Sequence, residues 1–293
     1  MKNESGQAVL VVLLVMAVVL TIVLSILGAS TSDIRISSNE TESLRAFSAA
    51  EAGIEKALLY NSSAQGSVGS ANYNVSVTTL AEGTKSFNYP TNLVSGDVAM
   101  LWFVAHDANG NLVCNAGTPC FTGKTVKVCW GKSGTSALSP TAPALDLTIY
   151  YLTTPGNYAT VRTAKAVYDP NSSRLAGNFY AAADLGSCDI GGVSYQFQKT
   201  VDLSSLGIGA SSYNNQNGLQ FLSVRTLYNS DVDQPLGFDL NFAGNSAIPA
   251  QGSKIDSTGT LNASTRRIVV ASPFSGYPPI IDNAVFSPSG IAQ

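Results

Sequence analysis

Few side chains in this sequence have the types and spacing that catalysis requires. His106 is the only histidine, so a serine–histidine–aspartate arrangement would have to use it. It is followed by DANGN, in which Asn109 and Gly110 are typical of a tight hairpin turn. The sequence contains neither a G-x-S-x-G nucleophile elbow nor a phosphate-binding loop. We therefore predict a turn beside this histidine and no enzymatic activity, although glycosidases can draw their two acids from distant positions.

Three aspartates form the best candidate for a metal site. Asp231, Asp233 and Asp239 lie within NSDVDQPLGFDLN, and carboxylates are the hard oxygen ligands that Ca²⁺ prefers. The glycine and the glutamate of an EF-hand loop are missing from this stretch. We keep a calcium site as a weak expectation, with hydrated loop carboxylates as the alternative. The sequence indicates no other cofactor.

The four cysteines favour disulfides over a metal site. The chain has neither the C-x-x-C pairs nor the additional histidines that zinc sites use. An even number of cysteines behind an export-competent segment is typical of an oxidising compartment. Of the three possible pairings we favour Cys114–Cys120, closing the loop CNAGTPC, and Cys129–Cys188, joining two strands. Free buried thiols are the alternative.

Composition narrows the range of partners. Charged residues make up 12% of the chain and the net charge is −3, so no long-range field attracts nucleic acid. No basic run is longer than Arg266-Arg267, which argues against a nucleic-acid-binding protein. The chain has 12 tyrosines and 2 tryptophans, which could form a sugar-binding face. Aromatic residues in strands more often belong to the core.

The elements that must position these residues begin with an apolar N-terminal segment. Ala8–Leu27 contains no charged residue, and only Thr21 and Ser25 are polar. A helix of this length can cross the hydrocarbon core of a bilayer, which is roughly 30 Å thick. An ordinary secretory signal has a shorter apolar core and more cations before it, although LGAS offers a possible cleavage site. The segment passes instead into further helix-compatible sequence.

This continuation predicts one long helix from Gln7 to about Tyr60. The stretch SNETESLRAFSAAEAGIEKALLY contains no proline, and its apolar residues recur at steps of three and four. Poor helix formers at Gly28–Asp33 predict a bend or a partly melted stretch. Glu51 lies beside the apolar stripe, where it either pairs with a partner subunit or the protein's own globular domain, or is a solvated charge mildly repelled by Glu55. The predicted stripe comprises Leu44, Phe47, Ala50, Ile54, Ala57 and Leu58.

The N-terminal region resembles the type IV pilin superfamily. A short leader ending in glycine, an apolar helix directly after it and an amphipathic extension are together typical of that superfamily. The stretches GQAVLVVLLVMAVVLTIVLS and RAFSAAEAGIEKAL are similar to PilX-type minor pilins and to the atypical tip pseudopilin of type II secretion. The motif AAEAG at Ala49–Gly53 is characteristic of that group. The resemblance covers about residues 1–60.

The resemblance implies a route of maturation and assembly. A prepilin peptidase would cut between Gly6 and Gln7, and the new amine would be methylated. The helix would anchor a single-pass precursor in membrane lipid, N-terminus in and C-terminus out, and then pack among other pilins at an inner-membrane assembly platform. Val11 stands where ordinary pilins carry a glutamate that pairs with a neighbour's N-terminal amine, and tip pseudopilins lack it too. The residues expected to pack are Val11, Phe47, Glu51, Ile54 and Leu58.

After Asn61 the sequence predicts a β-rich body. The stretch NSSAQGSVGSAN indicates a linker over 61–72, and β-branched and aromatic residues then predict a series of strands. The fold class is therefore α+β, with a leader at 1–6, a helix at 7–60 and a sandwich-like extracytoplasmic domain at 73–293. The stretch 204–217 is either a boundary within this domain or, as we prefer, a long surface loop. The predicted strands are Tyr73–Leu80, Val98–His106, Lys124–Trp130, Leu145–Leu152, Tyr158–Asp169, Val193–Leu203, Leu219–Tyr228, Arg266–Ser272 and Asp282–Ser287.

Together these features predict a non-enzymatic minor pilin or pseudopilin. Its β domain would project from the membrane, and later from an extracellular fibre, toward other subunits, a surface glycan or DNA. One alternative is a membrane-tethered β-sandwich binding module that never assembles. A less favoured alternative is an exported hydrolase.

Overall fold

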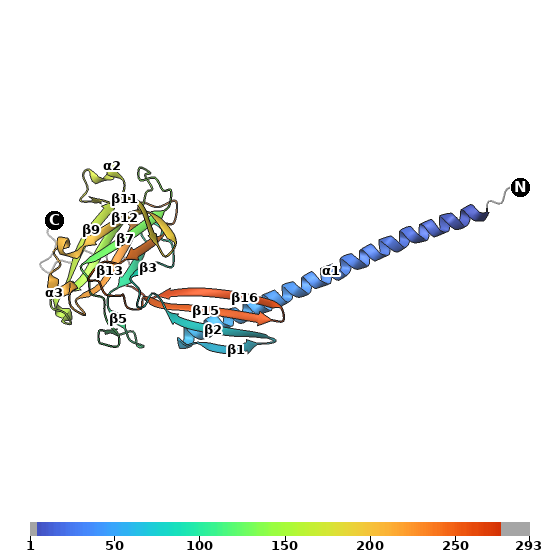
Figure 1. Cartoon of the computed structure of the whole chain (residues 1–293), viewed down its shortest axis with the longest axis horizontal. Helices are drawn as coiled ribbons and strands as arrows, with labels where there is room; N and C mark the ends of the chain where they lie inside the picture. Colours follow the sequence, from blue (N-terminus) through green and yellow to red (C-terminus); the bar gives the residue numbers. More distant parts are fainter. Residues whose placement is uncertain (1–4, 277–293) are drawn as a thin grey trace, which may run out of the picture. The chain divides into compact units, whose positions relative to one another are not determined.

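The structure, a computed structural model, describes residues 5–276 as one long helix and several β-sheets (Figure 1). This confirms the predicted α+β class. The chain divides into two compact units, one comprising residues 1–77 with 255–270 and the other 78–254 with 271–293. The first unit thus takes strands from both halves of the sequence. This division differs from the predicted single β domain at 73–293.

The first unit is built on helix α1, Ser5–Tyr60. Its 56 residues give a length of about 84 Å, at 1.5 Å per residue. The helix continues through Gly28–Asp33, so the expected melted stretch is wrong. Thr31 Oγ1 donates to the carbonyl of Gly28 at 2.9 Å, which satisfies the hydroxyl within the helix. The long helical flanks outweigh the local cost of a glycine, about 1 kcal/mol.

A four-stranded sheet completes the first unit, in the order β1-β2-β15-β16. β1 and β2 form an antiparallel hairpin, and Gly69 supplies the positive φ of 58° in its turn. Residues 64–68 were expected in a linker, which is wrong because they pair with β2, whose Tyr73 and Val75 are buried. The strands are β1 (Ala64–Val68), β2 (Ala71–Thr79), β15 (Gly252–Leu261) and β16 (Ser264–Pro273).

The second unit contains two five-stranded sheets, in the orders β10-β9-β8-β13-β4 and β11-β12-β7-β14-β3. The first sheet consists of β4 (Val98–Trp102), β8 (Ala144–Leu152), β9 (Val161–Asp169), β10 (Ala181–Ala182) and β13 (Leu219–Leu227). The second consists of β3 (Ser86–Asn88), β7 (Thr125–Lys132), β11 (Asp184–Ile190), β12 (Val193–Asp202) and β14 (Leu236–Asp239). The short helices are η1 (Tyr158–Thr160), α2 (Ser172–Leu175), η2 (Leu203–Leu206) and α3 (Ala210–Tyr213).

One hydrophobic core lies between the two sheets. Trp130 and Phe197 of the second sheet belong to the same buried cluster as Leu147 and Leu222 of the first. Trp130 also satisfies its indole N–H, which donates to the carbonyl of Pro143 at 2.8 Å. Two sheets that bury their inner faces against each other form a sandwich, as the sequence predicted.

Most strand predictions are confirmed in place. Every predicted range within residues 5–276 contains an observed strand, whereas Asp282–Ser287 lies outside the described residues. The turn predicted at Asn109-Gly110 connects β5 (Ala105–His106) to β6 (Leu112–Val113). Residues 204–217 contain helices η2 and α3 and lie wholly inside the second unit, as expected of a connection within one domain and not of a boundary.

Both disulfides have the favoured pairing. Cys114–Cys120 closes a loop with a Cα separation of 5.4 Å. Cys129–Cys188 joins β7 to β11 with a Cα separation of 6.0 Å. Neither strand pairs with the other, since β12 lies between them. The second disulfide therefore fastens non-adjacent strands of one sheet.

Candidate functional site: the N-terminal helix

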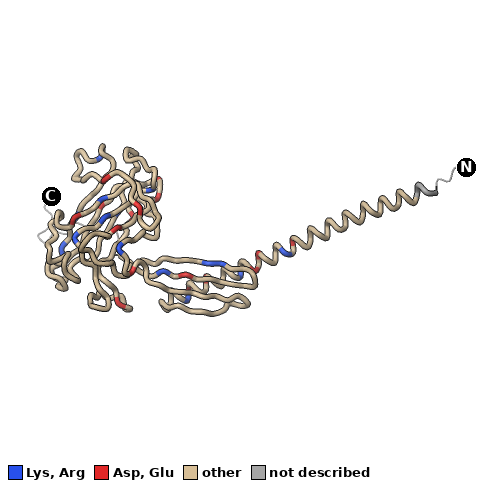
Figure 2. The backbone as a smooth tube through the Cα atoms, in the orientation of Figure 1, with Lys and Arg blue, Asp and Glu red and all other residues tan. Residues whose placement is uncertain are grey.

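The N-terminal half of α1 exposes apolar side chains on every side. The sequence has no charged residue from 5 to 32, and Figure 2 shows no charged residue along the described start of the helix. All residues from Val9 to Leu27 are exposed, and Val11 retains 58% of its surface. Within residues 5–276, α1 is the one helix long and apolar enough to cross a membrane. A helix that is apolar all round must be buried in lipid or among other helices.

The C-terminal half of α1 packs on the sheet of its own unit through small side chains. Ala46, Ala49, Ala50 and Ala57 are fully buried there. The strand opposite them also has a glycine, Gly259, at which an added Cβ would overlap the carbonyl oxygen of Ala46. Because both surfaces lack bulky side chains, helix backbone and strand backbone come into direct contact.

A second close approach lies one helical step further along. A Cβ on Gly53 would overlap the hydroxyl of Ser257 on β15 and lie 3.1 Å from the ring of Tyr73 on β2. Ile54 is the large side chain buried beside this contact, with Val75 and Ile255 in the same cluster. The helix therefore packs on the sheet through a surface of small residues and one larger buried side chain, Ile54.

Polar contacts fix the register of the helix on the sheet. Asn262 Nδ2, in the turn between β15 and β16, donates to Glu42 Oε1 at 2.9 Å. Arg266 Nε on β16 donates to Ser43 Oγ at 2.8 Å. These exposed bonds add little stability each, but they orient the helix where it leaves the sheet.

The apolar stripe seen in the sequence coincides only partly with the face that α1 buries on its own sheet. Ile54, Ala50 and Ala57 are buried as expected, but Phe47 and Leu58 are 43% and 55% exposed. The two faces differ because backbone contact with β15 requires small residues, whereas the stripe consists mainly of large ones, and packing of Phe47 and Leu58 against other subunits stays a prediction. Leu44, Phe47 and Leu58 instead form an exposed face of α1. The run AFSAAEAG contains the signal that could have identified the buried face.

The other predicted packing and processing residues keep the status of expectations. Glu51 is exposed, and no hydrogen bond or ion pair reaches it from residues 5–276. Its pairing with a partner subunit therefore stays a prediction. Gly6 and Gln7 belong to the first turns of α1. Cleavage between them and methylation of Gln7 are likewise predictions.

The three candidate calcium ligands each have a separate neighbour. Asp231 accepts from Thr141 Oγ1 at 2.9 Å, and Asp233 accepts from Asn92 Nδ2 at 3.1 Å. Asp239 accepts from the backbone N–H of Asn241 at 3.0 Å. Over residues 5–276, no group of three or more His, Cys, Asp and Glu side chains could hold a metal ion. The structure therefore does not bring these carboxylates together, and calcium binding remains an untested expectation.

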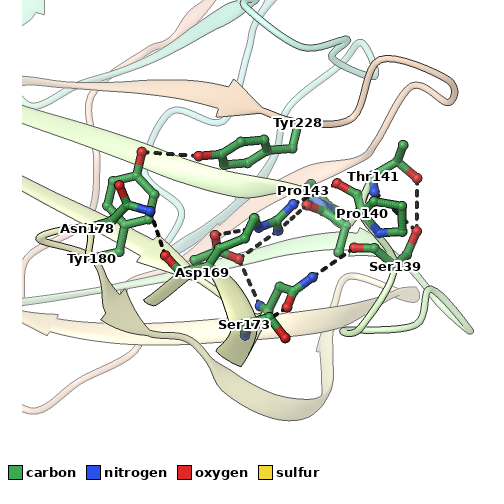
Figure 3. A network of polar contacts seen from close by, with 12 residues as sticks. Ser139, Pro140, Thr141, Pro143, Asp169, Ser173, Asn178, Tyr180 and Tyr228 are labelled. Atoms are coloured by element: carbon green, nitrogen blue, oxygen red, sulfur yellow. Dashed lines mark hydrogen bonds and ion pairs between the residues drawn. The ribbon is translucent and has the colours of Figure 1, made fainter. Parts of the chain in front are cut away.

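A buried ion pair in the second unit is a structural clamp (Figure 3). Asp169 has a fully buried side chain and accepts from Arg174 Nε at 2.8 Å and from Arg174 Nη2 at 2.7 Å. The guanidinium also donates to the carbonyls of Pro140 and Ala142, and its face lies 4.1 Å from the ring centre of Tyr228. The carboxylate and the guanidinium bind each other, and the guanidinium also contacts two loop carbonyls and the Tyr228 ring. The pair therefore holds three chain segments together.

One family model matches the chain. Residues 5–55 match the model described as PilX N-terminal, which covers the apolar half of α1 and most of the half that packs on its sheet. The match confirms the resemblance to PilX-type pilins for this segment, and it indicates a type IV pilin-like protein. No curated protein and no solved structure matches the chain.

Proposed function

We propose that this protein is a minor pilin or pseudopilin, a non-enzymatic subunit that α1 carries from the membrane into a type IV pilus-like or secretion fibre. One observation carries the proposal. The residues that match the PilX N-terminal model form a single helix whose first half exposes apolar side chains all round and whose second half is fixed to its own sheet. Such a helix can exchange lipid for neighbouring helices without unfolding the sheet.

A position at the tip is supported by Val11. A glutamate at this place would put a carboxylate in the apolar stem, and burying it would require a cationic partner. Valine needs no such partner, so the subunit can add where no neighbour offers an N-terminal amine. We infer a low-copy tip or initiating subunit, with prepilin peptidase, other pilins and the inner-membrane platform as its partners.

The first test is the mature N-terminus. N-terminal sequencing of the native protein should begin at Gln7, with a methylated amine detected by mass spectrometry. Gly6→Leu should leave the precursor uncleaved and remove the protein from sheared fibres. Gly28→Leu is the matched control, because no atom lies within 4 Å of a Cβ at this exposed position of the same helix.

Two outcomes would contradict the proposal. A native protein that begins at Ser30 would have lost the stem, and one that begins at Met1 and stays in the membrane would be a tethered binding module. The tip position has its own test, in which Val11→Glu should raise the copy number of the subunit in sheared fibres. An unchanged copy number would show that Val11 does not determine the position of the subunit in the fibre.

A further inference from the structure

The second unit contains a partly open cavity of about 220 Å³ beside the only histidine of the sequence. Four chain segments form its wall, at 82–83, 105–106, 118–119 and 247–250. Pro119, Ile248 and Pro249 contribute apolar surface. The side chains with polar atoms are Glu82, His106 and Thr118. The cavity thus combines an apolar wall with a few convergent polar groups, the composition typical of small-molecule sites.

The imidazole of His106 is fixed by aromatic rings. Its centre lies 4.6 Å from the ring of Trp102 and 4.2 Å from the ring of Phe274. The Gln251 side chain holds the backbone of Trp102, accepting from its N–H at 2.8 Å and donating to its carbonyl at 2.9 Å. The N–H of Phe274 donates to the carbonyl of Gln251 at 2.9 Å. One glutamine therefore positions both rings that enclose the histidine.

The opposite wall is fixed by a disulfide. Thr118 lies inside the loop that Cys114–Cys120 closes, and its backbone N–H donates to Asn115 Oδ1 at 2.9 Å. The Asn115 N–H donates to the Thr118 carbonyl at 3.2 Å. Because both sides are held in place, a ligand would meet a largely preformed site, which lowers the entropic cost of binding.

Three buried polar atoms in this region have no hydrogen-bond partner among residues 5–276: Trp102 Nε1, His106 Nδ1 and Thr118 Oγ1. A buried polar atom without a partner costs about 1–3 kcal/mol, so three at one place are unusual in a native protein. Burial also lowers the pKa of His106, although Asp107 opposes this shift, and the imidazole is neutral at pH 7. A neutral imidazole offers one donor and one acceptor. Two of the three side chains, His106 and Thr118, line the cavity itself, so a ligand bound there would lie beside both of them.

We propose that this cavity binds one hydroxylated ring, the terminal sugar residue of a surface glycan. Its volume lies below the roughly 300–1,000 Å³ of pockets for drug-sized ligands, so it accommodates a single ring. Sugar hydroxyls both donate and accept, which suits the imidazole of His106 and the hydroxyl of Thr118. The apolar C–H face of a sugar suits the proline and isoleucine wall. No Lys or Arg lines the cavity, so it does not select an anion.

The test uses the full chain in a detergent without a sugar headgroup. Methyl glycosides of glucose, galactose, mannose and N-acetylglucosamine are titrated to about 50 mM, well above the millimolar affinity expected for one ring. Ligand-observed saturation-transfer NMR should detect saturable binding of at least one glycoside. His106→Phe keeps the ring stack and Thr118→Val keeps the side-chain shape, yet each should weaken binding about 10-fold by removing one hydrogen bond.

The controls separate binding from folding. Thr163→Val, an exposed position on β9, should bind as the wild type does, and Ala247→Phe should abolish binding by filling the cavity. Circular dichroism melts must show each variant folded. The proposal is overturned if no glycoside binds, or if His106→Phe and Thr118→Val bind the glycosides as tightly as the wild type does. None of these outcomes depends on assembly of the protein into a fibre.

Discussion

Replacing Gly259 by alanine tests the backbone contact between α1 and its sheet. The new Cβ would overlap the carbonyl oxygen of Ala46 and lie 2.7 Å from the backbone nitrogen of Ala50. The backbone of Gly259 lies outside the left-handed region, so alanine itself is not strained there. Overpacking costs about 1–3 kcal/mol, and we expect about 3 kcal/mol because both obstructing atoms belong to a helix backbone that cannot rotate away.

The assay is amide hydrogen exchange of β2 and β15, followed by mass spectrometry on the full chain in micelles. A loss of about 3 kcal/mol lowers protection about 100-fold, since each 1.4 kcal/mol is a factor of 10. Ser257→Ala is the matched control on the same strand. Its hydroxyl is buried and has no hydrogen-bond partner in the part of the chain that the structure describes, so its removal should leave protection unchanged or raise it. Wild-type protection in Gly259→Ala would refute the backbone contact and, with it, the account of the small-residue surface.

Three further perturbations address the second unit. Arg174→Met should destabilise it by about 3–5 kcal/mol, because the buried Asp169 carboxylate loses its partner, and adding Asp169→Asn should recover part of the loss in thermal melts. Removing Cys129–Cys188, which spans 59 residues, should lower the free energy of unfolding by about 4 kcal/mol in denaturant titrations. Removing Cys114–Cys120, which spans 6, should lower it by about 2 kcal/mol, and equal losses would contradict the loop-entropy argument. The pKa of His106 is lowered in the fold, so the unfolded chain binds the proton more readily and wild-type stability should fall below pH 6.5. The stability of His106→Phe should not fall over this pH range. Identical pH profiles for the variant and the wild type would contradict the prediction.

The long helix and most of the strands follow from local sequence. Ala8–Leu27 predicts an apolar helix independently of its surroundings, because no charged residue interrupts it over a length that can span a bilayer. Strand β8 alternates apolar and polar residues over LDLTIY, so its period of two is visible without a structure. β15 was missed because GSKIDSTGTL is rich in glycine and serine, and it becomes a strand only beside β2 and β16.

The sequence by itself determined the apolar stem, the sandwich-forming strands and a plausible pairing of four cysteines, since each rests on residues close together or on simple counting. Only the tertiary structure decided which face of α1 is buried. Gly53 and Gly259 are more than 200 positions apart, and nothing local says that a helix and a distant strand will meet backbone to backbone. The same holds for the cavity at His106, whose wall comes from four separate segments. Contacts between distant residues depend on how complete surfaces fit together, and that fit has no period in the sequence.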